Sequence, residues 1–262
     1  MSAPSLKQRF EAFMASLSSA ENIDEILKSS SRCYPDAGYV RFLEDFKRAD
    51  YLAFNRAAII EQKSLEVDVD GKLGIFLNKL IKDRGVIGCG ATSIEYIIKQ
   101  MPDRDELNKK LFQLLSQGVD KKLSDCDTQI ENTRELFLIS EAIGIVVLLN
   151  ENAQYLTPDL LVYRAFHTIR KRDARGAVRY PNIHAVLIIS EAHRIIGEGT
   201  SELIPVETIL SDTGAVLQAT VRCTEALSRL WCAFNQAGYV DSTVGPRLVR
   251  TRDPHKPIHI SS

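Results

Sequence analysis

Two acidic residues and a lysine occur close together in one short apolar stretch of this chain. If that stretch folds as a β-hairpin about Asn55 and Arg56, Asp50 lies opposite Glu61 on the neighbouring strand. Lys63 projects from the same face as Glu61, because side chains alternate along a strand. Like charges directly opposite destabilise an antiparallel pair. Two carboxylates and an ammonium on one face are therefore typical of a site that binds a hard cation and an anionic substrate.

Both faces of this expected hairpin also carry apolar side chains. Leu52 and Ile59 would share a face with the two carboxylates, whereas Tyr51 and Ile60 would take the other face. Both faces are then partly buried, and a buried carboxylate needs a partner. The alternative is a solvated polar face, and the turn lacks the glycine of the strongest hairpin signal.

The pattern of an acidic residue two positions before a lysine is common, and it recurs elsewhere in the chain. Asp45 falls in an amphipathic helical pattern, Asp70 stands beside a glycine in an expected turn, and Asp120 falls in an expected connection between helices. Only Glu61 and Lys63 lie in a β-branched run with a carboxylate at the matching hairpin position. Their position in an expected strand therefore distinguishes Glu61 and Lys63, as candidate site residues, from the other occurrences of the pattern.

The spacing of apolar residues predicts the elements that must position these side chains. The expected helices cover residues 10–17, 23–27, 39–46, 73–81, 92–101, 107–115, 128–144, 157 onward and 227–234. The helix from Thr128 is predicted by a capping box, Thr128-Gln-Ile-Glu131. Besides the hairpin, strands are expected at 145–149 and 183–189. The second hairpin strand is expected to continue through Val69 and to end at Asp70-Gly71.

This order of elements indicates an α/β fold. Its mixed sheet would contain the antiparallel hairpin, followed by strands joined through helical crossovers and flanked by extra helices. A single domain is expected over residues 1–262. Residues 1–48 would form its helical N-terminal segment, and residues 72–118 are a candidate helical subdomain.

Composition leaves the chemical hypothesis open. Of the 262 residues, 45% are hydrophobic and 26% are charged, which is ordinary for a globular protein. The net charge of −1 neither favours nor excludes a nucleic-acid partner. Five scattered cysteines without a CxxC pair indicate reduced thiols and a cytoplasmic location. Neither a signal-peptide core nor an apolar run of about 18 residues occurs, so no membrane span is expected. The oligomeric state, a homodimer included, is left open.

An aspartate, an intervening strand and then Glu61-Gln62-Lys63 resemble the motif of the PD-(D/E)xK nuclease superfamily. The resemblance covers mainly residues 44–67, and Ala49 stands where the family motif has its proline. It implies a restriction-endonuclease-like fold in which a helix precedes the hairpin and a helix and a further strand follow. It also implies that Asp50, Glu61 and the main-chain carbonyl of Gln62 bind Mg²⁺ or Mn²⁺. Lys63 would position water or stabilise charge on the phosphate.

The same resemblance suggests further residues outside the hairpin. Many members of the family place an acidic residue on the preceding helix, for which Glu11, Glu25 and Glu44 are candidates that the sequence does not separate. Some members carry a glutamine and a basic residue on a later helix, similar to Gln129 and Arg134. The alternative for this pair is a capped amphipathic helix with its polar residues facing outward.

A cluster of basic residues after the helix that begins at residue 157 could contact phosphates. It comprises Arg170, Lys171, Arg172, Arg175 and Arg179, of which Arg172 and Arg175 are the expected contacts. Phosphate contacts supply most of the non-specific affinity for nucleic acid. The alternative is a solvated basic loop.

The sequence thus favours a divalent-metal-dependent nuclease that hydrolyses phosphodiester bonds, in DNA rather than in RNA. The second hypothesis keeps the fold without the reaction. It is a catalytically inactive module that binds nucleic acid or protein in a defence or repair assembly.

Overall fold

Helices and strands follow one another as an α/β protein requires. The computed structural model describes residues 3–33, 46–65, 69–84, 98, 101–196, 202–211 and 216–236. Its helices are α1 (Leu6–Ser16), α2 (Ile23–Cys33), α4 (Val69–Arg84), α6 (Arg104–Phe137), α7 (Pro158–Ile169) and α8 (Leu217–Phe234), with a 3₁₀ turn at Glu191–His193. Its strands are β1 (Glu21–Asn22), β2 (Tyr51–Ala53), β3 (Ala58–Ser64), β4 (Ile143–Asn150), β5 (Ala185–Ser190), β6 (Ile195–Ile196), β7 (Glu202–Leu203) and β8 (Val206–Leu210).

Six of these strands form one open mixed sheet in the order β1-β2-β3-β4-β5-β8. The pairs β3–β4 and β4–β5 are parallel, and the other pairs are antiparallel. Parallel neighbours need a crossover connection. Here the chain passes through α4 and α6 between β3 and β4, and through α7 between β4 and β5. The expected α/β fold with an antiparallel hairpin in a mixed sheet is therefore confirmed.

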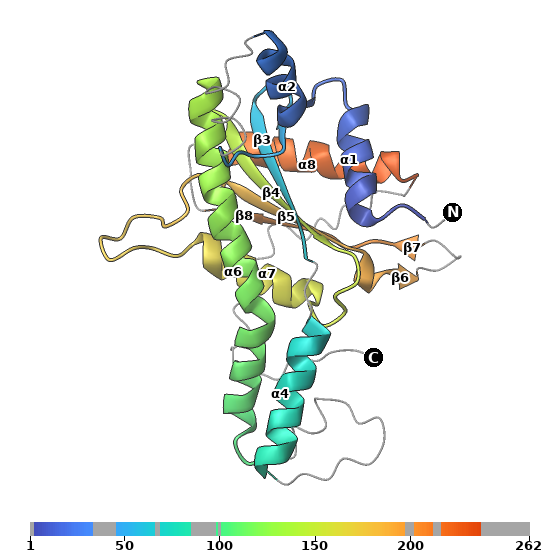
Figure 1. Cartoon of the computed structure of the whole chain (residues 1–262), viewed down its shortest axis with the longest axis vertical. Coiled ribbons are helices and arrows are strands. Elements are labelled where there is room, and N and C mark those ends of the chain that lie inside the picture. The colour runs from blue at the N-terminus through green and yellow to red at the C-terminus, as the bar shows by residue number, and fades with distance from the viewer. Residues whose placement is uncertain are drawn as a thin grey trace.

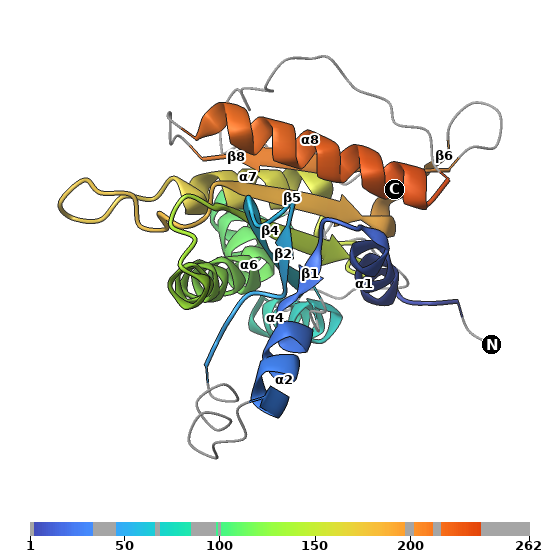
Figure 2. The same ribbon diagram turned by 90° about the horizontal axis from the view of Figure 1, so that it is seen from above.

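Helices cover both faces of the sheet (Figures 1 and 2). On one face, an apolar cluster joins the sheet to α2, α4, α6 and α7, with Leu52, Ile59 and Val146 at its centre. On the other face, a second cluster joins the sheet to α1 and α8 through the buried aromatic rings of Phe10, Phe13 and Trp231. The β3 strand is therefore packed on both sides, which removes the side chains of its middle residues from solvent.

Helix α6 corrects the prediction of two helices separated by a charged connection. It runs without a break from Arg104 to Phe137, so Asp120 and the expected capping box at Thr128 both lie in its interior. The first and last residues of a capping box are three positions apart, and such residues are neighbours on the surface of any helix. The spacing of Thr128 and Glu131 therefore does not by itself mark a helix start. Gly118 lies inside the helix, but a helical glycine costs only about 1 kcal/mol relative to alanine.

The structure also corrects the end of the hairpin strand. The β3 strand ends at Ser64, and Val69 begins α4, so Asp70 and Gly71 lie in a helix and not in a turn. The period-two pattern from Leu65 to Val69 misled the prediction, because a helical pattern begins within it. The prediction of a helix over 73–81 is confirmed.

Gly144 belongs to β4 and not to a helix end. A Cβ atom at this position would lie 2.0 Å from the carbonyl oxygen of Asn182, so no larger residue fits without movement of the main chain. The strands expected at 145–149 and 183–189 are confirmed with small shifts, as is the helix from Thr157, whose hydroxyl caps the amide of Leu160. Edge strand β8 was not predicted, because its five residues lack a clear alternation.

Several predictions fall on residues outside the described ranges. These include most of the helices expected at 39–46 and 92–101. The division into one domain with segments at 1–48 and 72–118 stays a prediction. Within the described residues, no helix combines the length and the apolar character that a membrane span needs.

Candidate functional site

The β2–β3 hairpin has the register that the sequence predicted. Tyr51 pairs with Ile60, Leu52 with Ile59 and Ala53 with Ala58. Asp50 directly precedes this ladder, its amide donates a bond of 3.2 Å to the carbonyl of Ile60, and its side chain lies within hydrogen-bonding distance of Glu61. Leu52 and Ile59 belong to the apolar cluster under α6, whereas Tyr51 and Ile60 belong to the cluster on the other face, as expected.

The hairpin turn is held by residues from outside the hairpin. Phe54, Asn55 and Arg56 have φ values of 53°, 54° and 67°, which residues with a Cβ rarely adopt. The Arg56 guanidinium pairs with Glu21 at 2.8 Å and lies over the ring of Phe137 at 5.7 Å. These contacts compensate for a turn without glycine and keep the two strands in register.

Helix α6 positions the main chain directly before Asp50. Three of its side chains hydrogen bond to that segment: Gln129 to the carbonyl of Arg48, Asn132 to the carbonyl of Lys47 and Thr133 to the amide of Ala49. These bonds are 2.6 to 2.8 Å long. Asp50 is thus fixed by a long helix as well as by the sheet.

The Asp50 side chain continues the hydrogen bonding of the hairpin beyond the end of β2. Its Oδ2 accepts a bond of 2.8 Å from the amide of Gln62, and its carbonyl accepts one of 3.0 Å from the amide of Ile23. Burial raises the pKa of Asp50 above its ordinary value, although the Gln62 amide and Glu61 act in the opposite direction. The carboxyl group is therefore held in one orientation beside the β3 strand.

Glu61 is the most strongly perturbed acid of the hairpin. It is 1% exposed, one carboxylate oxygen is ion-paired with the Nζ of Lys63, and its carboxyl group lies within hydrogen-bonding distance of Asp50. Burial and the neighbouring charge of Asp50 raise the pKa of Glu61 to about 8, and Lys63 only partly opposes this. Near neutral pH this side chain therefore gains by taking up either a proton or a cation.

Lys63 is the positive group of the cluster. Burial by itself lowers the pKa of its ammonium, but the charge of Glu61 outweighs this and raises the pKa above the ordinary value. The Cys126 thiol of α6 is buried close to this ion pair, and burial together with Glu61 raises its pKa. Lys63 therefore stays charged and Cys126 stays protonated near neutral pH.

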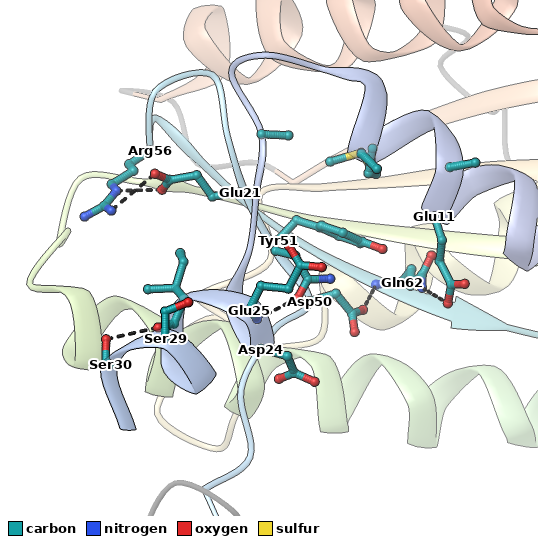
Figure 3. Close-up of a pocket in the computed structure, with 16 residues that line it drawn as sticks. Glu11, Glu21, Asp24, Glu25, Ser29, Ser30, Asp50, Tyr51, Arg56 and Gln62 are labelled. Carbon is teal, nitrogen blue, oxygen red and sulfur yellow. Dashed lines mark hydrogen bonds and ion pairs between the residues drawn. The ribbon is translucent and has the colours of Figure 1, made fainter. Parts of the chain in front are cut away.

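Gln62 points to the opposite face from Glu61, toward a cleft of about 1030 Å³ (Figure 3). Its Nε2 donates a bond of 3.3 Å to Glu11, and its buried Oε1 has no partner within the described part of the chain. The acidic residues that line the cleft are Glu11, Glu21, Asp24, Glu25 and Asp50, accompanied by Arg56. Asp50 thus belongs to the cleft and also faces Glu61.

The three acidic residues expected to join the site from the preceding helices differ in where the structure places them. Glu11 and Glu25 both line the cleft with Asp50, and Glu44 lies outside the described residues. The sequence did not single out Asp24, which also lines the cleft and whose charge contributes to the raised pKa of Asp50. The available signal was the run from Asn22 to Glu25, which is typical of a helix start with acids in its first turn.

A complete set of metal ligands is not assembled by the described side chains. In those ranges, no group of three or more histidine, cysteine, aspartate or glutamate side chains has the arrangement of a metal site. The hairpin supplies two carboxylates, of which Asp50 is fixed by the Gln62 amide and Glu61 is paired with Lys63. Carboxylate oxygens of this kind suit a hard divalent ion.

Gln129 and Arg134 have partners inside the protein. Gln129 holds the main chain before Asp50, and Arg134 bonds the carbonyl of Ala142 at 2.8 Å and the side chain of Asn182. Burial and the charge of Arg134 lower the pKa of nearby His184 to about 4. Contact of Gln129 and Arg134 with nucleic acid stays a prediction, which these bonds do not favour.

The basic cluster divides into anchored and exposed members. Arg170 lies over the ring of Phe166 at 3.9 Å, and Lys171 pairs with Asp120 of α6 at 2.9 Å. Arg172 and Arg175 are exposed in the connection between α7 and β5. The sequence missed Asp120 as the anchor because it was placed in a connection, although its spacing to Leu123 and Asp127 is that of one helix face.

Comparison of the chain with protein-family models, curated proteins and solved structures finds no match.

Proposed function

We propose that this protein is a divalent-metal-dependent nuclease that acts on DNA through Asp50, Glu61 and Lys63. The observation that carries the proposal is the state of Glu61. Its carboxyl group is 1% exposed, lies within hydrogen-bonding distance of the Asp50 carboxylate and has the Lys63 ammonium beside it. Two carboxylates this close cannot both stay charged without a cation, so Glu61 holds a proton near neutral pH, and a divalent ion between the two acids would replace that proton.

The residues around the acid pair suit such an ion and its chemistry. Mg²⁺ or Mn²⁺ bound there would lower the pKa of a coordinated water and offset the charge of a phosphodiester. Asp50 and Glu61 are the expected ligands, with the main-chain carbonyl of Gln62 as a third. In the metal-free protein, Lys63 neutralises one oxygen of Glu61. With an ion bound, the same ammonium would be available to hold positive charge beside the scissile phosphate.

The arrangement of elements gives the proposal further support. The acid pair lies on an antiparallel hairpin, the chain then passes through α4 and α6, and it returns in β4 parallel to β3. This is the order of elements that the resemblance to the PD-(D/E)xK superfamily implies. Helices α1 and α2 precede the hairpin and bring Glu11 and Glu25 to the cleft that Asp50 lines.

One observation favours the second hypothesis, a module that binds without cleaving. Glu61 and Lys63 form a buried ion pair that excludes solvent from one carboxylate oxygen. A buried ion pair of this kind can have a purely structural role, without binding a metal ion or a substrate. The protein would then bind nucleic acid or another protein through surfaces away from the hairpin.

A cleavage assay separates the two hypotheses. Supercoiled, linear and single-stranded DNA and single-stranded RNA are incubated with the parent, with Glu61→Gln and with Glu131→Gln, in Mg²⁺, Mn²⁺ or EDTA. Glu131 is an exposed acid of α6 and serves as the matched control. We expect metal-dependent cleavage of DNA by the parent and the control, and none by Glu61→Gln. Equal cleavage by Glu61→Gln would show that this acid is not catalytic.

A further inference from the structure

A narrow ribbon of chain leaves the body of the protein between α7 and β5, and it projects in both views (Figures 1 and 2). Residues 171–179, called the basic ribbon here, run out and back as two antiparallel arms. Arg172 lies opposite Val178. The amide of Arg179 donates to the carbonyl of Lys171, and the amide of Asp173 donates to the carbonyl of Ala177, both at 2.8 Å.

The tip of the basic ribbon is ordered by its own hydrogen bonds. The Asp173 carboxylate accepts bonds of 2.8 and 2.9 Å from the amides of Arg175 and Ala177. Gly176 has a φ of 81°, a conformation that favours glycine. The Arg172 guanidinium donates a bond of 2.9 Å to the carbonyl of Gly176. The tip is therefore shaped before any partner binds, which reduces the entropy lost on binding.

The base of the basic ribbon is fixed to the helices on the sheet face that carries Glu61. Lys171 pairs with Asp120 of α6, and Arg170 donates to the carbonyl of Leu210 and lies over Phe166. Tyr180, directly after the ribbon, is buried against the same apolar cluster. The ribbon is thus a firm projection.

Charge and side-chain size at the basic ribbon indicate its partner. Arg172, Arg175 and Arg179 are exposed, and in the described residues none of them has an ion pair with a carboxylate. The remaining tip residues are small, including Ala174 and Gly176. Protein interfaces are also enriched in arginine, but their centres add aromatic residues and methionine, which the ribbon lacks. Arginines on a narrow backbone suit a groove lined by phosphates.

We propose that the basic ribbon enters the major groove of B-form DNA. That groove admits a two-stranded ribbon, and arginine is its most common specific reader. The deep and narrow major groove of A-form RNA does not admit side chains in this way. The inference rests on the proposed function only in taking nucleic acid as the partner.

The basic ribbon is attached to the same sheet as the acid pair. In the register of the sheet, Glu61 of β3 pairs with Val146 of β4, and Val146 pairs with Val186 of β5. Two strand spacings separate Glu61 from Val186, roughly 10 Å. Residues 180–184 connect the ribbon to Ala185, the first residue of β5, so the ribbon is attached to a strand two positions from β3 in the same sheet.

The test measures binding in EDTA, where metal-dependent cleavage does not interfere. Fluorescence anisotropy follows a DNA duplex, its single strand and an RNA duplex of equal length, with the parent and the double variant Arg172→Ala/Arg175→Ala. Arg222→Ala, an exposed arginine of α8 on the other side of the sheet, is the control for charge. We expect the double variant to bind the DNA duplex roughly tenfold more weakly, with a salt slope lower by about one unit per lost phosphate contact. Equal affinities of parent and double variant would overturn the proposal, as would an RNA duplex or single strand bound as tightly as the DNA duplex.

Asp173→Ala distinguishes a shaped ribbon from a general positive patch. The change removes a negative charge, so simple attraction to phosphates would tighten binding. Because it also removes the bonds that shape the tip, we expect weaker binding to the DNA duplex. Tighter binding would overturn groove insertion, and so would displacement of the duplex by poly-L-glutamate at equal charge. Ribbon-dependent binding without cleavage in Mg²⁺ would contradict the proposed nuclease and leave this inference standing.

Discussion

Asp120 and Glu61 are two carboxylates withdrawn from solvent on the same side of the sheet, yet their surroundings differ. Asp120 is 22% exposed and accepts hydrogen bonds from Arg164, Thr168 and Lys171. Burial alone would raise its pKa, but these donors outweigh burial and lower it. Glu61 is 1% exposed, has one cation beside it and faces Asp50, and its pKa rises to about 8.

The difference separates an acid that serves the fold from an acid that is available for chemistry. Asp120 joins α6 to α7 and to the basic ribbon, and its donors leave little capacity for a further ligand. Glu61 has one cation beside it and shares its site with Asp50, so near neutral pH it holds a proton that a bound metal ion would displace. Strongly perturbed acids of the second kind cluster at functional sites.

Removal of the ammonium beside Glu61 should have the largest effect on activity. Lys63→Ala is expected to lower the rate of DNA cleavage by roughly 10²- to 10³-fold. Losses of this size are typical when an enzyme loses one group that stabilises charge in the transition state. Metal binding should persist, because the lysine acts on the phosphate and water. Lys63→Arg, which keeps the charge, should retain part of the activity in the same assay. Full activity of Lys63→Ala would exclude this role for the lysine.

The pH dependence of stability should have opposite signs for the two acids. Because Glu61 has a raised pKa, its contribution to stability is fully present below its ordinary pKa of 4.5 and is lost as pH rises toward about 8. The contribution of Asp120 is present above its ordinary pKa of 3.8 and is lost as pH falls. We therefore measure the free energy of unfolding of the parent and of Glu61→Gln by denaturant titration in EDTA. Between pH 4.5 and 8, the free energy of unfolding of the variant should rise relative to that of the parent by an amount on the order of a few kcal/mol. A constant difference across this range would contradict the raised pKa.

Loss of the structural acid should affect stability and spare the chemistry. Asp120→Ala leaves Arg164 and Lys171 without their carboxylate and is expected to lower the free energy of unfolding by roughly 2 kcal/mol. Asp125→Ala, an exposed acid on the same helix, should change it by less than about 0.5 kcal/mol. Chemical denaturation measures both variants. Equal effects would mean that the Asp120 network does not stabilise the fold.

The register of the hairpin could be predicted from sequence, because its cues are local. The run from Ala57 to Ile60 is apolar and β-branched, and Asp50 and Glu61 stand at matching distances from the turn at Asn55 and Arg56. The helices after the hairpin were harder, since a capping pattern at Thr128 looks the same inside a helix as at its start. The continuity of α6 depends on packing against the sheet and α7, which no short pattern reveals.

The sequence predicted which residues make up the site, but not all of their contacts. That Gln129 holds the chain before Asp50 could not be predicted from sequence, because this bond depends on the position of α6. The basic residues were found as a cluster, but their division into an anchored Lys171 and exposed Arg172 and Arg175 depends on Asp120, which is some fifty residues earlier in the chain.

The most direct test of the metal site is calorimetric unfolding of the parent and Glu61→Gln with and without Mg²⁺ or Mn²⁺. An ion that binds only the folded parent should raise its Tm, with a stabilisation of about 2.7 kcal/mol at a concentration one hundred times the Kd. At pH 8 and above, where Glu61 is charged, Glu61→Gln should melt no lower than the parent in EDTA because one of two neighbouring charges is gone, and it should lose most of the shift with metal. The same shift in both proteins, or no shift in the parent, would contradict metal binding between Asp50 and Glu61.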